Sequence, residues 1–136
     1  MSLTQNKFNY FSQDLAQGLH KLNTDQMTVA LSDTLPVATN HVLADLTPIS
    51  YTNLGSRNIT TTSCLQTSGT TKFLLTNLLI SATGNVAQWR YIVIYNSTAT
   101  NGNLIGWFDY GSEVNMVSGD SLSVTFDGTN GLLTIA

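Results

Sequence analysis

The chain has 136 residues, of which 10 % are charged, and its formal net charge is −3 at pH 7. An average soluble domain has about 25 % charged residues, and here Thr, Ser and Asn, roughly a third of the chain, take their place. The five basic residues are too few to neutralise a nucleic-acid backbone, and the sequence lacks the run of about 18 apolar residues that a membrane span needs. The composition predicts one soluble, β-rich domain over residues 1–136, with no nucleic-acid and no membrane partner.

The N-terminal segment has a helical period. Apolar residues recur there at spacings of three or four: Phe8, Phe11, Leu15, Leu19 and Leu22. This pattern predicts one amphipathic helix over about residues 6–22. Two roles remain open for it. Either the helix closes one end of its own fold, or the stripe of Phe8, Phe11 and Leu15 docks on a neighbouring subunit as a subunit contact.

From Met27 onward the period changes to two, which is typical of strands. A short strand is expected over residues 27–31, followed by a long ordered loop over 37–54 with a short strand at 49–52. A hairpin is expected next, because the β-formers of residues 59–65 and 72–81 flank a turn in which Gly69 supplies a positive φ.

The pattern of the C-terminal half predicts strands along its whole length. Residues 89–95 are apolar at nearly every position, which predicts a strand buried on both faces. The turn at Asn101-Gly102 then joins it to a partner strand over 104–110. Residues 122–126 and 132–135 complete what we interpret as a meander of short strands. The predicted fold is therefore mainly β: an antiparallel β-sandwich or jelly-roll-like barrel over 27–136, with one N-terminal amphipathic α-helix.

No pattern in the sequence indicates catalysis. Asp109 and Glu113 are the closest pair of acids in the C-terminal half, and a glycan hydrolase would need such a pair in a cleft. We favour turn residues for both. The segment Asp127–Gly131 resembles a calcium loop, but it lacks the closing Glu and the regular oxygen spacing, so a hairpin connection is expected. No enzyme activity, cofactor or metal is predicted.

The histidines and the cysteine give no metal-ligand spacing either. His20 is interpreted as a residue at the helix C-terminus that faces the dipole, and His41 lies in the long loop. Cys64, the lone cysteine, cannot form an internal disulfide and is interpreted as a small buried residue. Residues 1–7 lack the apolar core of a secretory signal, so we expect the protein to act, or be assembled, in the compartment where it is made.

Aromatic side chains are the remaining candidates for a binding surface. A sugar-binding sandwich exposes rings on one face, and this chain offers Trp89, Tyr91, Tyr95, Trp107 and Tyr110. Because residues 92–94 of the same strand are aliphatic, we expect most of these rings to be buried. Carbohydrate binding is kept as the second hypothesis.

Three stretches together resemble a known group of proteins. They are residues 27–36 (MTVALSDTLP), residues 42–54 (VLADLTPISYTNL), and WFDYG at 107–111 followed by FDGTNG at 126–131. Nearly the whole chain is similar to small virion proteins of tailed bacteriophages, most of all to the head decoration, or cement, proteins. Similar short proteins are assigned to tails, and no residue here separates the two locations.

The resemblance implies a structural role without a catalytic site. It implies a non-enzymatic protein of the virion surface, assembled in the host bacterial cytoplasm, that binds the major capsid protein as a homo-oligomer, with a trimer favoured. The alternative is a tail module that contacts a receptor or glycan. A neutral Thr/Ser/Asn surface suits either role, since repeated copies can pack with little charge repulsion.

Overall fold

A computed structural model describes residues 5–136 of the protein. Residues 1–4, part of the segment considered above for a secretory signal, lie outside the described residues. The elements, in chain order, are β1 (Asn6–Lys7), α1 (Phe11–Ala16), β2 (Met27–Ser32), a 3-10 helix η1 (Leu43–Asp45), β3 (Asn58–Ile59), β4 (Thr61–Thr67), β5 (Thr70–Leu75), β6 (Leu78–Ser81), β7 (Trp89–Asn96), β8 (Leu104–Val114), β9 (Ser121–Val124) and β10 (Leu133–Ile135). All strand pairs are antiparallel. The prediction of a mainly β, sandwich-like fold is confirmed.

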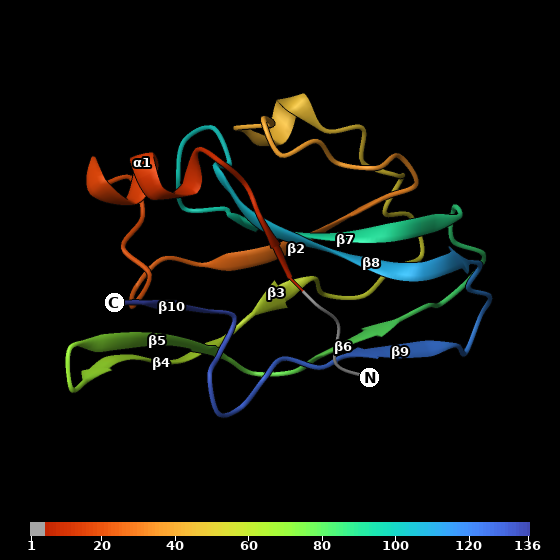
Figure 1. Ribbon diagram of the computed structural model, residues 1–136. Helices are drawn as coiled ribbons and strands as arrows, with labels where there is room; N and C mark the ends of the chain where they lie inside the picture. Colours follow the sequence, from red (N-terminus) through yellow and green to blue (C-terminus); the bar gives the residue numbers. More distant parts are fainter. Residues whose placement is uncertain (1–4) are drawn as a thin grey trace.

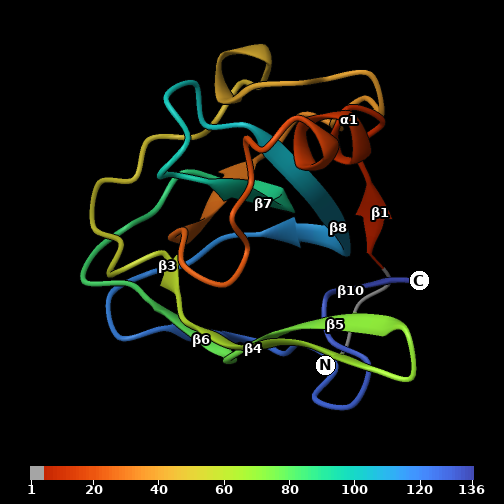
Figure 2. The ribbon, with the colours of Figure 1, turned by 90° about the vertical axis from the view of Figure 1, so that its left-hand side faces the viewer.

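The strands lie in two layers, which Figures 1 and 2 show one above the other. One layer is a five-stranded sheet in the order β1-β8-β7-β2-β3. The other contains a three-stranded sheet, β10-β5-β4, and the pair β6-β9. The expected hairpin at Gly69 is present as β4–β5, and the expected strand pair around Asn101-Gly102 is present as β7–β8.

Strand β7 lies between β2 and β8 and is buried on both faces, as predicted from its apolar run. Its side chains alternate between two clusters. Ile92 and Ile94 face the second layer, whereas Val93 and Tyr95 belong to a smaller cluster on the outer face. This second cluster is closed by Phe8 and by residues of the long loop, so the outer face of the sheet is covered at one end.

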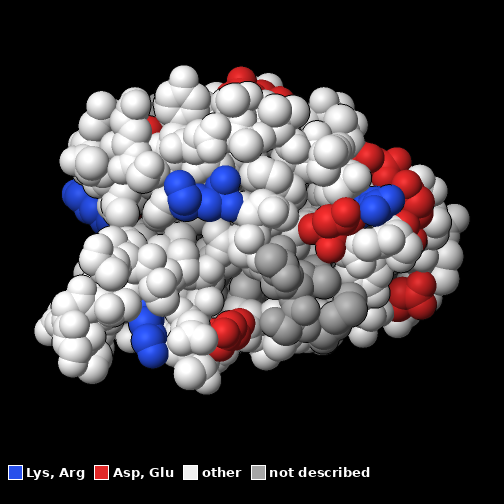
Figure 3. All heavy atoms as spheres, in the orientation of Figure 1, with Lys and Arg blue, Asp and Glu red and all other residues white. Residues whose placement is uncertain are grey.

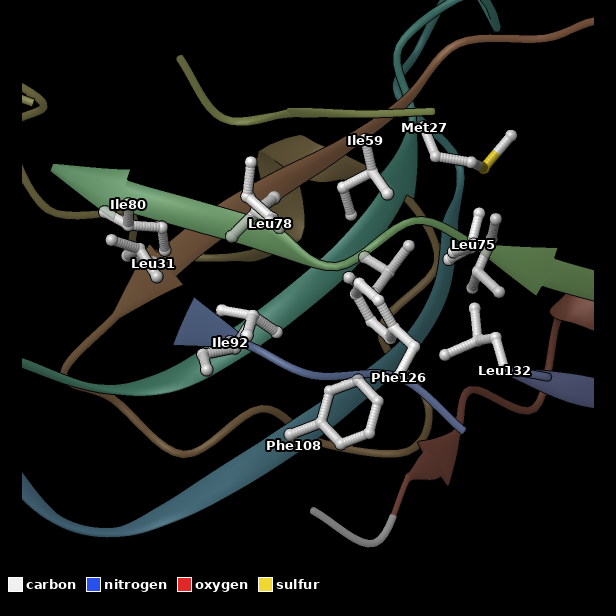
Figure 4. Close-up of a cluster of buried hydrophobic side chains, with 14 of the residues drawn as sticks. Met27, Leu31, Ile59, Leu75, Leu78, Ile80, Ile92, Phe108, Phe126 and Leu132 are labelled. Carbon is white, nitrogen blue, oxygen red and sulfur yellow. The ribbon is translucent and has the colours of Figure 1, made fainter. Parts of the chain in front are cut away.

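The main core fills the space between the layers. Figure 4 shows side chains from both layers that point toward one another: Met27, Leu31, Ile92 and Phe108 from the five-stranded sheet, and Leu75, Leu78, Ile80, Phe126 and Leu132 from the other layer. All of these side chains are buried. Burial of one such side chain contributes about 1.5–3 kcal/mol, and this apolar contact holds the chain together without a disulfide, since its one cysteine is free.

The N-terminal helix is shorter than predicted. A helix over residues 6–22 is wrong at both ends, because α1 covers only Phe11–Ala16 and residues 6–7 instead pair with β8. Gly18 ends the helix with φ at +81°. Its N–H donates to the Leu15 carbonyl, and the next N–H, of Leu19, donates to the Asp14 carbonyl. This is a Schellman motif, which satisfies the last carbonyls and turns the chain away.

Three other expectations are also wrong. The strand expected at 49–52 is absent, because Ile49 instead donates one backbone hydrogen bond to Leu31. The strand expected over 72–81 is interrupted after Leu75. The last strands form no meander. Strand β9 pairs with β6, and β10 pairs with β5, so both return to partners far back in the sequence.

Candidate functional site

The three predicted subunit-contact residues belong largely to the chain's own core. Phe8 has 0 % exposure, and its ring centroid lies 4.6 Å from that of Trp107. Phe11 is buried as well, and Leu15 is half-buried. Phe11 and Leu15 line one wall of an apolar groove of about 440 Å³, and Leu133 and Ile135 of β10 line the opposite wall. Of the three residues, Leu15 is the one that stays partly accessible, and it is reached from this groove.

Next to these residues lies a buried polar cluster built around Asp14. The Asp14 side chain has 0 % exposure, although it comes from the short surface helix. His41 Nε2 lies 2.9 Å from each carboxylate oxygen, and Asn103 Nδ2 donates to Oδ2 at 2.9 Å. The ring of Tyr10 stacks on His41. Helix α1, the long loop and the start of β8 are thereby joined by one carboxylate.

A second set of polar contacts continues this cluster through Asn96, at the end of β7. Asn96 Nδ2 donates to Asp25 Oδ2 at 2.7 Å and to His20 Nδ1 at 3.1 Å. The Asn96 Oδ1 atom accepts the backbone N–H groups of Thr98 and Ala99, which fixes the turn toward β8. The cluster therefore ties the N-terminal segment to the β7–β8 connection.

His20 is not at the helix C-terminus, where the sequence pattern placed it. The helix ends before it, and the imidazole is buried and stacked on Phe11. Burial lowers the pKa of His20 below its ordinary value of 6.5, although the carboxylates of Asp14 and Asp25 act in the opposite direction. With a pKa below 6.5 the ring is mostly neutral at pH 7, and its Nε2 has no hydrogen-bond partner among residues 5–136.

The sequence did carry one overlooked signal for this cluster. Asp14 lies three residues after Phe11 and one before Leu15, so it falls on the apolar face of the predicted helix. A carboxylate at such a position must find partners when it is buried. Nothing local identifies those partners, since His41 and Asn103 are 27 and 89 residues away.

Asp109 and Glu113 lie within strand β8 and not in the turn expected for them, and each is hydrogen-bonded to another side chain of the protein. Asp109 accepts two hydrogen bonds from Arg90, at 2.8 and 3.1 Å, and a third from the Gly111 backbone. The Arg90 bonds lower the pKa of Asp109. Glu113 accepts a hydrogen bond from Gln88, and a hydrogen bond with Asp33 raises the pKa of Glu113. Both acids are exposed.

The other candidates also have structural roles. Asp127 accepts the backbone N–H groups of Thr129 and Asn130, bonds that lower its pKa and close a tight turn. Cys64 is half-buried, packs at the margin of the main core, and has a pKa raised by burial. Burial makes it less reactive than an ordinary thiol.

Most of the aromatic rings are buried wholly or in part. Trp89 and Tyr95 are buried, whereas Tyr91, Trp107 and Tyr110 are half-buried. Tyr91 and Trp107 lie near one another on the outer face of the five-stranded sheet, since β7 places Tyr91 opposite Asp109 and Val93 opposite Trp107. This pair is the part of the predicted ring set that solvent can reach together.

All eight acidic residues of the chain accept hydrogen bonds from the chain itself. The acceptors are Asp14, Asp25, Asp33, Asp45, Asp109, Glu113, Asp120 and Asp127. Within residues 5–136, no group of three or more His, Cys, Asp and Glu side chains could hold a metal ion. In the same range no helix has the length and apolar character needed to cross a membrane.

Comparison of the chain with protein-family models, with curated proteins and with solved structures finds no match.

Proposed function

We propose that the protein is a non-enzymatic structural component of a bacteriophage virion, a decoration protein that binds the major capsid protein lattice and stabilises the head. The observation that carries this proposal is the use of the carboxylates. In an enzyme that uses general acid–base catalysis, a carboxyl group faces a cleft, where it can exchange a proton with the substrate. Here every acid is hydrogen-bonded to a turn, a loop or a neighbouring side chain of its own chain.

The surface supports the same proposal. On the face shown in Figure 3, charged groups are few and most of the area is uncharged. A protein that binds many identical sites on a shell gains avidity from repetition and needs only modest contacts at each site, of about 800 Å² per partner. The proposed state is a homo-oligomer on the capsid surface, a trimer by resemblance, assembled in the host cytoplasm.

The test uses expanded phage heads that lack their decoration protein. Purified protein is added, the heads are heated, and DNA release is followed with a fluorescent dye. The proposal predicts saturable binding and a higher release temperature. Unexpanded procapsids serve as the control, because a lattice-specific protein will not stabilise them. Heads that neither bind the protein nor gain heat resistance contradict the proposal.

One observation favours the alternative, a tail module that contacts a receptor or glycan. The strand register places Tyr91 and Trp107, both half-buried, on the same face of the sheet, and aromatic faces bind the C–H groups of sugars. Trp107 is half-buried whereas Trp89 has 0 % exposure, so fluorescence changes during a glycan titration report on Trp107. A saturable change that Trp107→Phe removes would favour this alternative over head decoration.

A further inference from the structure

We propose that strand β4 pairs with the β4 strand of a second copy of this chain, antiparallel and about a two-fold axis at Leu65. The inference does not depend on a phage origin. It starts from the backbone of β4, which is the outer strand of the sheet β10-β5-β4 and pairs with no strand on its other side in the described part of the chain.

Strand β4 lacks most of the features that protect an edge. Natural edge strands carry charges or proline, are very short, or are covered by another segment. The seven residues of β4 include no charged residue and no proline. One irregularity in the register lies between Thr61 and Ser63, which leaves the five residues from Ser63 to Thr67 regular. This part of the edge is available as a template for another strand.

The turn at the end of β4 fixes which backbone groups face outward. Thr67 pairs with Thr70 across a two-residue turn, in which Ser68 and Gly69 have φ of 52° and 84°. Two positive φ values identify a type I′ turn, whose flanking residues form a hydrogen-bonded pair. Because such pairs alternate along an antiparallel ladder, the N–H and C=O groups of Cys64 and Gln66 point away from β5.

These two residues lie on either side of Leu65, so a second copy of the same uncharged strand can match them when it runs antiparallel about an axis at Leu65. When two β4 strands meet about an axis at Leu65, Cys64 of each copy lies opposite Gln66 of the other. Each such pair exchanges two backbone hydrogen bonds. Leu65 then lies opposite its own equivalent in a non-hydrogen-bonded pair, where side chains approach most closely. Leu65 is 73 % exposed, the most exposed large apolar side chain among the described residues.

Charge permits this contact between identical copies. Each copy carries a net charge of −3, which opposes self-association through a charged face. The strand itself brings no charge to the axis. The nearest charge is Lys72 of β5, which pairs with Leu65 inside each copy. The two Lys72 residues would lie three strand spacings apart, about 14 Å, beyond the Debye length of about 8 Å.

The contact is small, so it is concentration-dependent. A pair of five-residue strands buries less than the roughly 1,200 Å² of a standard stable interface. Many copies held close together on a shell would raise the effective concentration. A two-fold contact cannot form inside a cyclic trimer, so with the proposed trimer it would link two neighbouring oligomers.

Cross-linking tests the register directly. The variant Cys64→Ser/Leu65→Cys places one thiol at the axis, where opposed Cα atoms fall in the range that a disulfide bridges. The matched control is Cys64→Ser/Leu79→Cys, since Leu79 is also well exposed, at 60 %, but lies on β6. Under mild oxidation we expect disulfide-linked dimers to form at least tenfold faster in the first variant. Equal rates in the two variants overturn the proposal.

Sedimentation equilibrium of the full chain provides the second measurement. The expected result for the wild type is a mass that rises with concentration above the 14.7 kDa of one chain. Leu65→Lys places like charges opposite one another and should abolish the rise, whereas Leu79→Lys should preserve it. The inference is overturned if Leu65→Lys does not reduce the rise of mass with concentration. It is also overturned if the wild-type mass does not rise with concentration. Capsids are absent from both assays, so failure here is distinct from failure of head binding.

Discussion

Phe8→Ala tests whether the N-terminal segment is part of the fold or a detachable arm. Phe8 has 0 % exposure and closes the outer-face cluster formed with Ala30, Val93 and Leu104. Removal of a buried phenyl ring typically costs about 3–5 kcal/mol, against a total stability of about 5–15 kcal/mol for a domain. For a chain of this length the loss corresponds to a fall in Tm of about 10–20 °C.

The assay is thermal unfolding followed by circular dichroism, with Leu19→Ala as the matched control. Leu19 belongs to the same sequence stripe but is 45 % exposed, so its truncation should change stability by no more than about 0.5 kcal/mol. Near-ultraviolet signals should also change in Phe8→Ala, because Trp107 loses its neighbouring ring. If the two variants unfold at the same temperature, the packing described for Phe8 is refuted.

Three further predictions follow from the polar cluster and from one glycine. Burial lowers the pKa of His20 below 6.5 in the folded protein. As the pH falls, His20 is therefore protonated at higher pH in the unfolded chain than in the folded one. The free energy of unfolding should decrease as the pH drops from about 6.5 toward the folded-state pKa. Urea unfolding at pH 7.5, 6.5 and 5.5 should show this decrease in unfolding free energy, and His20→Gln should make it smaller. If the pH dependence is the same in His20→Gln, the lowered pKa of His20 is contradicted. Asp14→Ala leaves Asn103 and His41 without their shared acceptor and should cost about 1–3 kcal/mol in urea unfolding, whereas a loss under about 0.5 kcal/mol would contradict the role given to Asp14. Gly131 has φ of +78°, and a Cβ there would overlap the Phe73 carbonyl. Gly131→Ala should therefore lower the free energy of unfolding by more than the roughly 1–2 kcal/mol of left-handed backbone strain alone. The control Gly128→Ala, with no atom near its Cβ, should lower it far less.

The parts of the fold that the sequence predicts are those encoded by local pattern. The β7–β8 pair follows from one apolar run, one Asn-Gly turn and one aromatic strand, all within residues 89–114. The β4–β5 hairpin follows from strand formers around Gly69. In both pairs the partner strand is the next one along the chain, so the pattern indicates the pairing as well as the strands.

Pairing between distant strands was not predicted, for a physical reason. Strands β9 and β10 have the expected alternation, yet the alternation does not specify their partners β6 and β5. The interruption after Leu75 separates two strands that the sequence reads as one. At the N-terminus, the helical period continues past the point where Gly18 ends the helix. A period describes which face is apolar, whereas a single cap residue decides where the element stops.

The candidate site was predicted only in part. Asp127 accepts the backbone hydrogen bonds of the turn predicted for it. Asp109 and Glu113, also predicted as turn residues, instead lie within strand β8. The polar cluster around Asp14 was missed because its members come from separate parts of the chain and share no motif. Phe8 and Phe11, predicted as candidates for a subunit contact, are buried within the chain itself.

Cosedimentation with expanded, undecorated heads tests the proposed function most directly. Protein is mixed with heads at increasing ratios, the heads are pelleted, and the bound protein is counted per major capsid subunit. The proposal predicts saturation at a fixed ratio set by the lattice, with little binding to unexpanded procapsids. Protein that stays in the supernatant at every ratio, or binds both particles alike without saturating, contradicts a decoration role.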